Sequence, residues 1–345
     1  MVARTFIAIL AAAAITGAGP AARAQTPSQV LTVVSFGGKL DQAYKKATAN
    51  FEKQFGATIR WVPGTSTENA ARISATRSNG EYDVAILDSL TYGGPQRLGA
   101  FAKLDPAIVK NLADVGAAAK YPDESAVAIG FNLTGLFYNT KVFQERGWAA
   151  PTSWDDLFRP EFCNNVGILH PNVAHGTTLL VLLAGGDIEK VPDGIARLSK
   201  LKGCLRTLEP SSPKMEEKIQ LGEYAIGVYG SVSVVTLAKN GNPVRFVAPK
   251  EGTVQTATTC SVVKGGNEKL AQEFCNALLD PSAQAILRDE SLYVPSSGKV
   301  DIPDDLLRLG LPTAEMVKSA ISLDSAKVAE RRRDWARRVE REMFP

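Results

Sequence analysis

The chain has 345 residues, a formal net charge of +3, 22% charged residues and 7% aromatic residues. This balance is ordinary for a globular protein, and a nearly neutral total argues against a dedicated nucleic-acid-binding protein. The length is sufficient for two domains, or for one domain with two lobes.

The first 24 residues have the pattern of a secretory signal peptide. Arg4 supplies a basic start, residues 6–15 are almost wholly apolar, and an Ala-Arg-Ala sequence at 22–24 suits a signal peptidase. The apolar run is shorter than the roughly 20 residues that a spanning helix needs. We therefore predict cleavage before Gln25, export to the periplasm and a mature chain with a formal charge of +1. An N-terminal core helix is the alternative.

Strands and helices alternate in the first hundred residues of the mature chain. An apolar strand near 32–35 leads through two glycines into an amphipathic helix whose apolar stripe runs from Tyr44 to Phe55. Strands are expected at 57–62 and 82–88, with a second helix capped by Thr65 or Ser66 between them. This order predicts an α/β fold with a parallel sheet.

The second half repeats the α/β pattern. Residues 126–139 form a β-rich run that is too long for one ordinary strand, so we expect two strands or a crossover between lobes. The further predicted elements are a short helix capped by Thr152 or Ser153, strands at 166–169, 225–229, 244–247 and 258–263, and helices at 177–184, 213–221 and 268–279.

Residues 326–344 predict a long C-terminal helix. Val328, Trp335, Val339 and Met343 lie on one stripe, and arginines interleaved with acids cover the remaining surface. A basic helix can bind nucleic acid or anionic lipid. Because acids alternate with the arginines and the chain is exported, we expect a docked apolar stripe beneath a solvated charged face.

The cysteines indicate disulfides. Cys163, Cys204, Cys260 and Cys275 form an even set in an exported chain, and three pairings are possible. We favour Cys163–Cys204 with Cys260–Cys275, because each pair brackets one strand–helix neighbourhood. Four buried thiols are the alternative, and the absence of a paired C-x-x-C motif argues against zinc.

Motifs for catalysis and nucleotide binding are poor. Residues 35–39 (SFGGK) fit neither the P-loop nor the dinucleotide-binding pattern. A G-x-S-x-G nucleophile elbow is missing, and His170 and His175 lie five residues apart, unlike the i, i+4 pair of a helical zinc site. We therefore predict no enzyme activity, no cofactor and no resident metal.

Small polar residues recur at the ends of the predicted strands, at 35–38, 65–67, 88–89, 230–231 and 256–259. In parallel α/β sheets, ligands bind at the carboxyl ends of strands. Backbone N–H groups, hydroxyls and helix N-termini there can hold an anionic or zwitterionic group. Their repetition in two α/β halves predicts a ligand cleft rather than five unrelated helix caps.

Several blocks of the sequence, taken in order, resemble a known family. They are the signal peptide, the opening LTVVSFGGKLDQAYKKATANF block, EYDVAILDS, GLFYN…PTSWDDLF and LGEYAIGVYGS. The order resembles the periplasmic solute-binding proteins of ATP-driven importers. Within them it is similar to the group that holds spermidine/putrescine receptors and their iron(III), thiamine, phosphonate and GABA-type relatives. The resemblance covers nearly the whole mature chain.

The resemblance implies a type II periplasmic binding protein fold. Each lobe is then a mixed sheet flanked by helices, with the ligand cleft between the lobes and a hinge near Thr134 and Gly135. The implied segments are a signal peptide at 1–24, lobe I at 25–130 and 247–300, and lobe II at 131–246 and 301–345 with the C-terminal helix. Hinge closure would present the protein to the membrane subunits of an ABC permease. We expect a monomer that binds a small solute and no nucleic acid.

By the same resemblance, the polar strand ends line the two sides of the cleft. The expected ligand-binding residues are Ser35, Phe36, Gly37, Gly38, Thr65, Ser66, Thr67, Asp88, Ser89, His175, Thr177, Tyr229, Ser231, Thr256 and Thr258. We expect Asp88 to bind an amine and Tyr229 to form a stacking wall. The expected anion donors are Ser35, Thr65, Ser66 and Thr258.

The residues in the matching loops argue against two ligand classes of this group, polyamines and iron(III). Polyamine receptors hold amines with carboxylates and aromatic rings, but residues 170–175 and 256–259 contain no acid. Iron(III) receptors show adjacent tyrosines, whereas Tyr229 is followed by Gly230. We predict a small polar solute, either a polyamine-like amine or, in better agreement with these residues, a zwitterion such as an amino acid, GABA or an aminophosphonate. A secreted α/β hydrolase and a ligand-binding protein for a chemoreceptor or sensor kinase are the alternatives.

Overall fold

A computed structural model describes residues 29–77 and 79–344, so the predicted signal peptide lies outside the described residues. The strands are β1 (Gln29–Ser35), β2 (Ala57–Pro63), β3 (Val84–Asp88), β4 (Val127–Asn139), β5 (Val166–Gly167), β6 (Ile226–Gly230), β7 (Val244–Val247), β8 (Val254–Val262) and β9 (Ile321–Ser322). Short 3-10 helices are η1 (Lys110–Ala113), η2 (Ala117–Ala119), η3 (Trp154–Phe158), η4 (Pro160–Phe162), η5 (Ile188–Lys190) and η6 (Ser199–Leu201).

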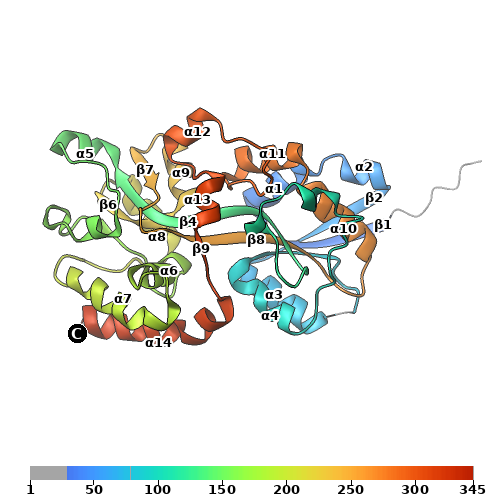
Figure 1. Ribbon diagram of the computed structural model, residues 1–345, viewed down its shortest axis with the longest axis horizontal. Helices are drawn as coiled ribbons and strands as arrows, with labels where there is room; N and C mark the ends of the chain where they lie inside the picture. Colours follow the sequence, from blue (N-terminus) through green and yellow to red (C-terminus); the bar gives the residue numbers. More distant parts are fainter. Residues whose placement is uncertain (1–28, 78, 345) are drawn as a thin grey trace, which may run out of the picture.

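The strands form one sheet, and the α-helices pack around it (Figure 1). They are α1 (Gly38–Ala47), α2 (Phe51–Phe55), α3 (Ser66–Thr76), α4 (Ser89–Arg97), α5 (Thr140–Arg146), α6 (Ala174–Leu183), α7 (Val191–Leu198), α8 (Ser212–Gln220), α9 (Ser231–Lys239), α10 (Glu268–Leu278), α11 (Pro281–Ser291), α12 (Asp304–Leu309), α13 (Ala314–Ser319) and α14 (Ser325–Met343). Within the described ranges, none of them has the length and apolarity of a membrane span.

One mixed sheet connects the two lobes. Its order is β2-β1-β3-β8-β4-β6-β5, with β7 paired to β4 and β9 paired to β8. Strand β1 is parallel to both β2 and β3, which confirms the predicted parallel start. Strands β4 and β8 are antiparallel to each other and run from one lobe to the other (Figure 1). The run at 126–139 is therefore one crossing strand, as the second of the two expected alternatives required.

Two glycines let β4 pass through this crowded region. A Cβ atom on Gly130 would stand 2.8 Å from the Cβ of Tyr293, and one on Gly135 would stand 2.5 Å from Cζ of Phe246. Neither glycine has a positive φ. Close packing, rather than unusual backbone conformation, is thus what requires glycine at these positions.

The hydrophobic core is divided differently on the two faces of the sheet. One large cluster contains Leu31 and Val33 of β1 together with Phe137 of β4, so it continues from one lobe into the other. Val34 faces a second cluster beneath α3 and α4, and Leu136 faces a third cluster that belongs to lobe II. Neighbouring strand residues point to opposite faces, which separates these clusters.

Helix α14 docks by the predicted stripe. Val328, Trp335, Val339 and Met343 are all buried in the lobe II cluster. The helix lies along α7 (Figure 1), and its first turn also reaches α4 of the other lobe. Its charged face is solvated and forms ion pairs, such as Arg331 Nη1 to Glu189 Oε2 at 2.6 Å.

Three predicted boundaries were wrong. The opening helix is divided into α1 and α2, because Thr48 ends the first segment by donating its hydroxyl to the carbonyl of Tyr44 at 2.8 Å. Helix α6 begins before His175 rather than at Thr177. The prediction missed this start because Val173 at the N-cap has no capping side chain, which is the usual start signal in a sequence. Strand β8 begins at Val254, so residues 256–259 lie inside a strand and not in a turn.

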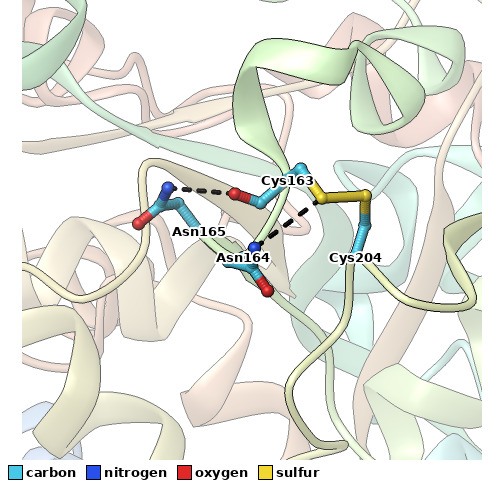
Figure 2. Close-up of a disulfide and its surroundings, with 4 residues drawn as sticks. All are labelled: Cys163, Asn164, Asn165 and Cys204. Carbon is cyan, nitrogen blue, oxygen red and sulfur yellow. Dashed lines mark hydrogen bonds between the residues drawn. A yellow bond between two sulfur atoms is a disulfide. The ribbon is translucent and has the colours of Figure 1, made fainter.

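Both predicted disulfides are present, Cys163–Cys204 and Cys260–Cys275. Figure 2 shows the first beside two asparagines: Asn164 Nδ2 lies 3.8 Å from Cys163 Sγ, and Asn165 Nδ2 donates to the Cys163 carbonyl at 3.2 Å. The second disulfide is fully buried and ties β8 to α10. Each bond joins one strand–helix neighbourhood, as expected.

Candidate functional site

The carboxyl ends of β1, β2 and β3 meet at one edge of lobe I, because these three strands are parallel. Each strand is followed at once by the N-terminus of a helix: α1, α3 and α4. This edge brings together the predicted residues Ser35, Phe36, Gly37, Gly38, Thr65, Ser66, Thr67, Asp88 and Ser89. The grouping follows from topology, since parallel strands place all their C-termini on one side.

The residues at this edge have different tasks. Phe36 packs against the large hydrophobic cluster. The Gly37 N–H donates to Asp41 Oδ1 at 2.9 Å. Ser66 Oγ accepts from the Asp88 N–H at 2.8 Å and so joins α3 to the end of β3. Ser35 is different, because its Oγ is buried with no hydrogen-bond partner in the described chain.

Thr65 is committed to its own helix. Its Oγ1 accepts from the Glu68 N–H at 3.2 Å, and the Thr65 N–H donates to Glu68 Oε2 at 2.8 Å, which completes a capping box. We expect Thr65→Ala to lower the free energy of unfolding by about 1 kcal/mol. Urea denaturation measures this, with the exposed Thr67→Ala as the control. Equal stability of T65A and wild type would show that the cap is not formed.

Asp88 lies among three tyrosines. Burial raises the pKa of Asp88 to about 6, against a smaller opposing effect of its hydrogen bond to Ser66. Burial first, and also the charge of Asp88, raise the pKa values of Tyr44, Tyr121 and Tyr293. The Tyr44 hydroxyl, like Ser35 Oγ, is buried with no hydrogen-bond partner among residues that the structure describes. A half-buried carboxylate beside phenol rings can hold an ammonium group by charge and cation–π attraction.

The sequence did not identify Tyr293 as a site residue. It follows Leu292, which ends α11 in the left-handed region with φ of 58°. Val294 then pairs with Phe131 of β4 through two backbone hydrogen bonds of 2.9 and 3.0 Å. Together these features place Tyr293 over Gly130. Loop positions of this kind carry no periodic pattern, so a tertiary contact was needed to find it.

Binding of an amine at Asp88 should depend on pH. An ammonium group requires the ionised carboxylate, so affinity should fall as pH drops below about 6, by up to about tenfold per pH unit. Burial lowers the pKa of His175 in lobe II to about 4, and the raised pKa values of the three tyrosines lie well above neutrality, so none of these groups titrates in that range. Calorimetry at pH 5, 6, 7 and 8 measures this. A flat profile would exclude Asp88 as the amine partner.

The stability of the ligand-free protein should follow the opposite trend. The folded state holds the Asp88 proton more tightly than the unfolded state, whose carboxyl has a pKa of about 4. The contribution of Asp88 is therefore fully present below pH 4 or so and is lost as pH rises through about 6.

A second polar group gathers in lobe II. His175 lies in the first turn of α6, and its Nδ1 is 2.8 Å from Thr134 Oγ1 on β4. Ser231, the first residue of α9, donates its hydroxyl to Asn132 Oδ1 at 3.0 Å. Thr177 is buried and donates to the Pro171 carbonyl at 2.5 Å, so its hydroxyl supports the loop before α6.

The structure does not support Tyr229 as a stacking wall. Its side chain is only 1% exposed, and its ring packs edge-on against His175 with centroids 5.3 Å apart. The Tyr229 hydroxyl donates to Glu216 Oε1 at 2.7 Å. A residue on a central strand of a covered sheet is buried on both faces, so Tyr229 lies behind His175.

The crossing strands align the two groups. Asp88 is opposite Thr258, Thr258 is opposite Gly130, and Asn132 is opposite Thr256. Opposite residues and alternate residues share a face of a sheet, so Thr256 and Thr258 face the same side as Asp88, Asn132 and Thr134. From Gly130 to Thr134 the strand advances about 13 Å.

Two further observations limit the chemistry. Ser89 lines a small pocket of about 90 Å³ together with Tyr121, Gln255 and Ser322. In residues 29–77 and 79–344, no group of three or more His, Cys, Asp or Glu side chains is arranged to hold a metal ion. The polar groups described in the two lobes are one carboxylate, phenols, hydroxyls, an amide and an imidazole, which suit binding of a small polar solute.

Comparison with known proteins finds relatives that are named as solute-binding proteins. The chain is 27% identical over 313 residues to the gamma-aminobutyric acid-binding protein of Pseudomonas aeruginosa, covering 85% of each chain. It is 24% identical over 314 residues to a putative 2-aminoethylphosphonate-binding periplasmic protein of Salmonella paratyphi A, covering 86% of this chain and 89% of the relative.

Solved structures agree with this fold. A putative extracellular solute-binding protein from Bordetella parapertussis matches 92% of this chain and 99% of its own, with a TM-score of 0.79 and 25% identity. A spermidine/putrescine transporter substrate-binding protein from Streptococcus pneumoniae matches 92% and 100%, with a TM-score of 0.77 and 17% identity. The family model for bacterial extracellular solute-binding proteins matches residues 93–310. The chain therefore belongs to the bacterial extracellular solute-binding protein family.

Proposed function

We propose that the solute of this periplasmic ABC-transporter binding protein is a small zwitterion with a primary ammonium group, which Asp88 binds. The observation that carries the proposal is the half-buried Asp88 carboxylate beside Tyr44, Tyr121 and Tyr293. One buried carboxylate balances one ammonium group, and an unpaired buried charge is costly. Lobe closure around the solute would then present the complex to the permease.

The names of the relatives support this class. Gamma-aminobutyric acid and 2-aminoethylphosphonate each carry an amine at one end and an acid at the other, and both names belong to relatives that match most of this chain. In the sequence comparison, the Salmonella typhimurium spermidine/putrescine-binding protein matches a smaller share of this chain, 67%. A polyamine remains the second candidate, because Glu216 provides a second carboxylate beside Tyr229 in lobe II.

Calorimetry with the mature protein tests the proposal. The panel is GABA, 2-aminoethylphosphonate, glycine, putrescine and spermidine, with a thermal-shift scan as the first screen. A ligand at 100 times its dissociation constant should add about 2.7 kcal/mol of stability. We expect a zwitterion to bind more tightly than either polyamine. Tight putrescine binding without zwitterion binding would replace the proposal by the polyamine alternative.

We also propose that the protein acts as a monomer and releases its solute unchanged. The two histidines are engaged in ways that support binding: His170 Nε2 contacts Glu340 at 2.9 Å, and His175 Nδ1 contacts Thr134. No serine hydroxyl bonds to either ring within the described residues. Sizing chromatography checks the monomer, and an NMR spectrum of GABA after overnight incubation checks for turnover.

A further inference from the structure

Two side-chain nitrogen atoms, from the partly exposed His175 and Asn132, pack closely against Gly230. A Cβ atom on Gly230 would stand 2.7 Å from His175 Nε2 and 2.9 Å from Asn132 Nδ2. Gly230 ends β6, and α9 begins at the next residue. Any larger residue would push both side chains away, so glycine keeps the two nitrogens next to each other.

Hydrogen bonds behind His175 allow two positions for its proton. The single Thr178 hydroxyl proton is within reach of Thr134 Oγ1 at 3.2 Å and of the His175 carbonyl at 3.1 Å, and Thr134 Oγ1 lies 2.8 Å from His175 Nδ1. When Thr178 donates to Thr134, Thr134 directs its own proton to Nδ1 and the neutral imidazole carries its proton on Nε2. When Thr178 donates to the carbonyl, Thr134 accepts from Nδ1–H instead. Both threonines are buried, which protects this chain of hydrogen bonds from water.

Asn132 has a fixed orientation as well. Its Oδ1 accepts from Ser231 Oγ at 3.0 Å and from the Val232 N–H at 3.1 Å. The amide oxygen is therefore occupied, and the two N–H bonds of Nδ2 are directed to the other side, toward Gly230. The amide N–H group of Asn132 and Nε2 of the uncharged His175 imidazole thus lie beside the same glycine.

We propose that His175 Nε2–H and Asn132 Nδ2–H bind the acidic end of the ligand, a carboxylate or phosphonate, in lobe II. The inference rests on the proposed function, because it assumes that Asp88 binds the ammonium end in lobe I. Hydrogen bonds from neutral donors to an anion are strong, and they avoid the cost of burying an unpaired cation in the ligand-free protein. One zwitterion would then contact both lobes, so that its two ends together favour lobe closure.

A cycle of variants and ligands tests the contact. Calorimetry compares GABA with n-butylamine, which has the same amine and chain but no acid. We expect His175→Ala to weaken GABA binding by about tenfold to a hundredfold and to leave butylamine binding unchanged within twofold. His175→Gln restores an N–H donor and should recover part of the GABA affinity. His170→Ala, at the histidine that contacts Glu340, is the matched control and should change neither ligand.

The proton position is measured without a ligand. Long-range ¹⁵N–¹H NMR distinguishes the two imidazole tautomers, and His170→Ala leaves His175 as the single histidine of the chain. We expect the Nε2–H tautomer in the ligand-free protein and a shift toward Nδ1–H in Thr134→Val. Thr134 is a positioning residue, so T134V should weaken GABA binding less than H175A and leave butylamine binding unchanged.

The outcomes separate this inference from the proposed function. Equal losses of GABA and butylamine affinity in H175A would mean that His175 only supports the fold, which overturns the inference while zwitterion binding stands. An Nδ1–H tautomer in the wild-type protein would overturn it in the same way. Absence of GABA and 2-aminoethylphosphonate binding to the wild-type protein would overturn the proposed function, and the inference with it.

Discussion

Replacing Asp88 with asparagine is expected to weaken binding of GABA or 2-aminoethylphosphonate by about a hundredfold or more, because it removes the carboxylate charge proposed to bind the ammonium group. The amide keeps the shape of the side chain and its contact with Ser66. Calorimetry of D88N and wild type at pH 7 measures the loss. Asp187→Asn is the control, since Asp187 caps η5 far from the strand ends and should leave affinity unchanged.

The same substitution should stabilise the ligand-free protein. Burial raises the pKa of Asp88, so the ionised carboxylate costs free energy at pH 7 that a neutral amide does not. A variant that binds poorly but unfolds at higher denaturant concentration is the expected combination for a residue kept for function. Retention of GABA affinity within fivefold in D88N would refute the role given to Asp88.

Loss of the Cys163–Cys204 disulfide is expected to reduce the free energy of unfolding by roughly 4 kcal/mol. The bond closes a segment of 41 residues that holds β5, α6 and α7, and the unfolded chain gains freedom when it is removed. Guanidinium denaturation of the double variant C163A/C204A measures this. Because His175 lies within the closed segment, GABA affinity should be followed in parallel.

The second disulfide gives the comparison. Cys260–Cys275 closes only 15 residues, for which loop entropy alone predicts about 3 kcal/mol. Both of its cysteines are fully buried, whereas Cys163 and Cys204 are partly exposed. A mild reductant should therefore cleave Cys163–Cys204 first. A loss below about 1 kcal/mol in C163A/C204A would contradict the loop-entropy account of this disulfide.

Local patterns were sufficient for much of the fold. The alternation of apolar strands and amphipathic helices up to Asp88 predicted the parallel strands β1, β2 and β3 and the gathering of their ends. The stripe from Val328 to Met343 predicted how α14 docks. Such patterns succeed because the spacing of apolar residues within an element indicates which of its sides is buried.

Boundaries without a local signal were missed. The start of α6 has no capping side chain. The sequence therefore predicts His175 in a loop, whereas it lies in the helix. The sequence predicts that the polar run at 256–259 lies at the end of a strand, but it lies inside β8, which crosses between the lobes beside β4. A run of polar residues usually indicates that a strand has ended. On a crossing strand, polar residues can instead lie in the interior, on the side that faces the ligand.

The sequence by itself indicated the family, the α/β class, a favoured disulfide pairing that the structure contains, and Asp88 as a candidate amine partner. Tertiary structure alone decided that Tyr44, Tyr121 and Tyr293 surround Asp88 and that Tyr229 lies behind His175. It alone brought Asn132 and Thr134 of β4 to His175 of α6. The physical reason is sequence distance: periodicity reports which side of an element is buried, whereas these groups come from separate elements that meet only when β4 and β8 join the lobes.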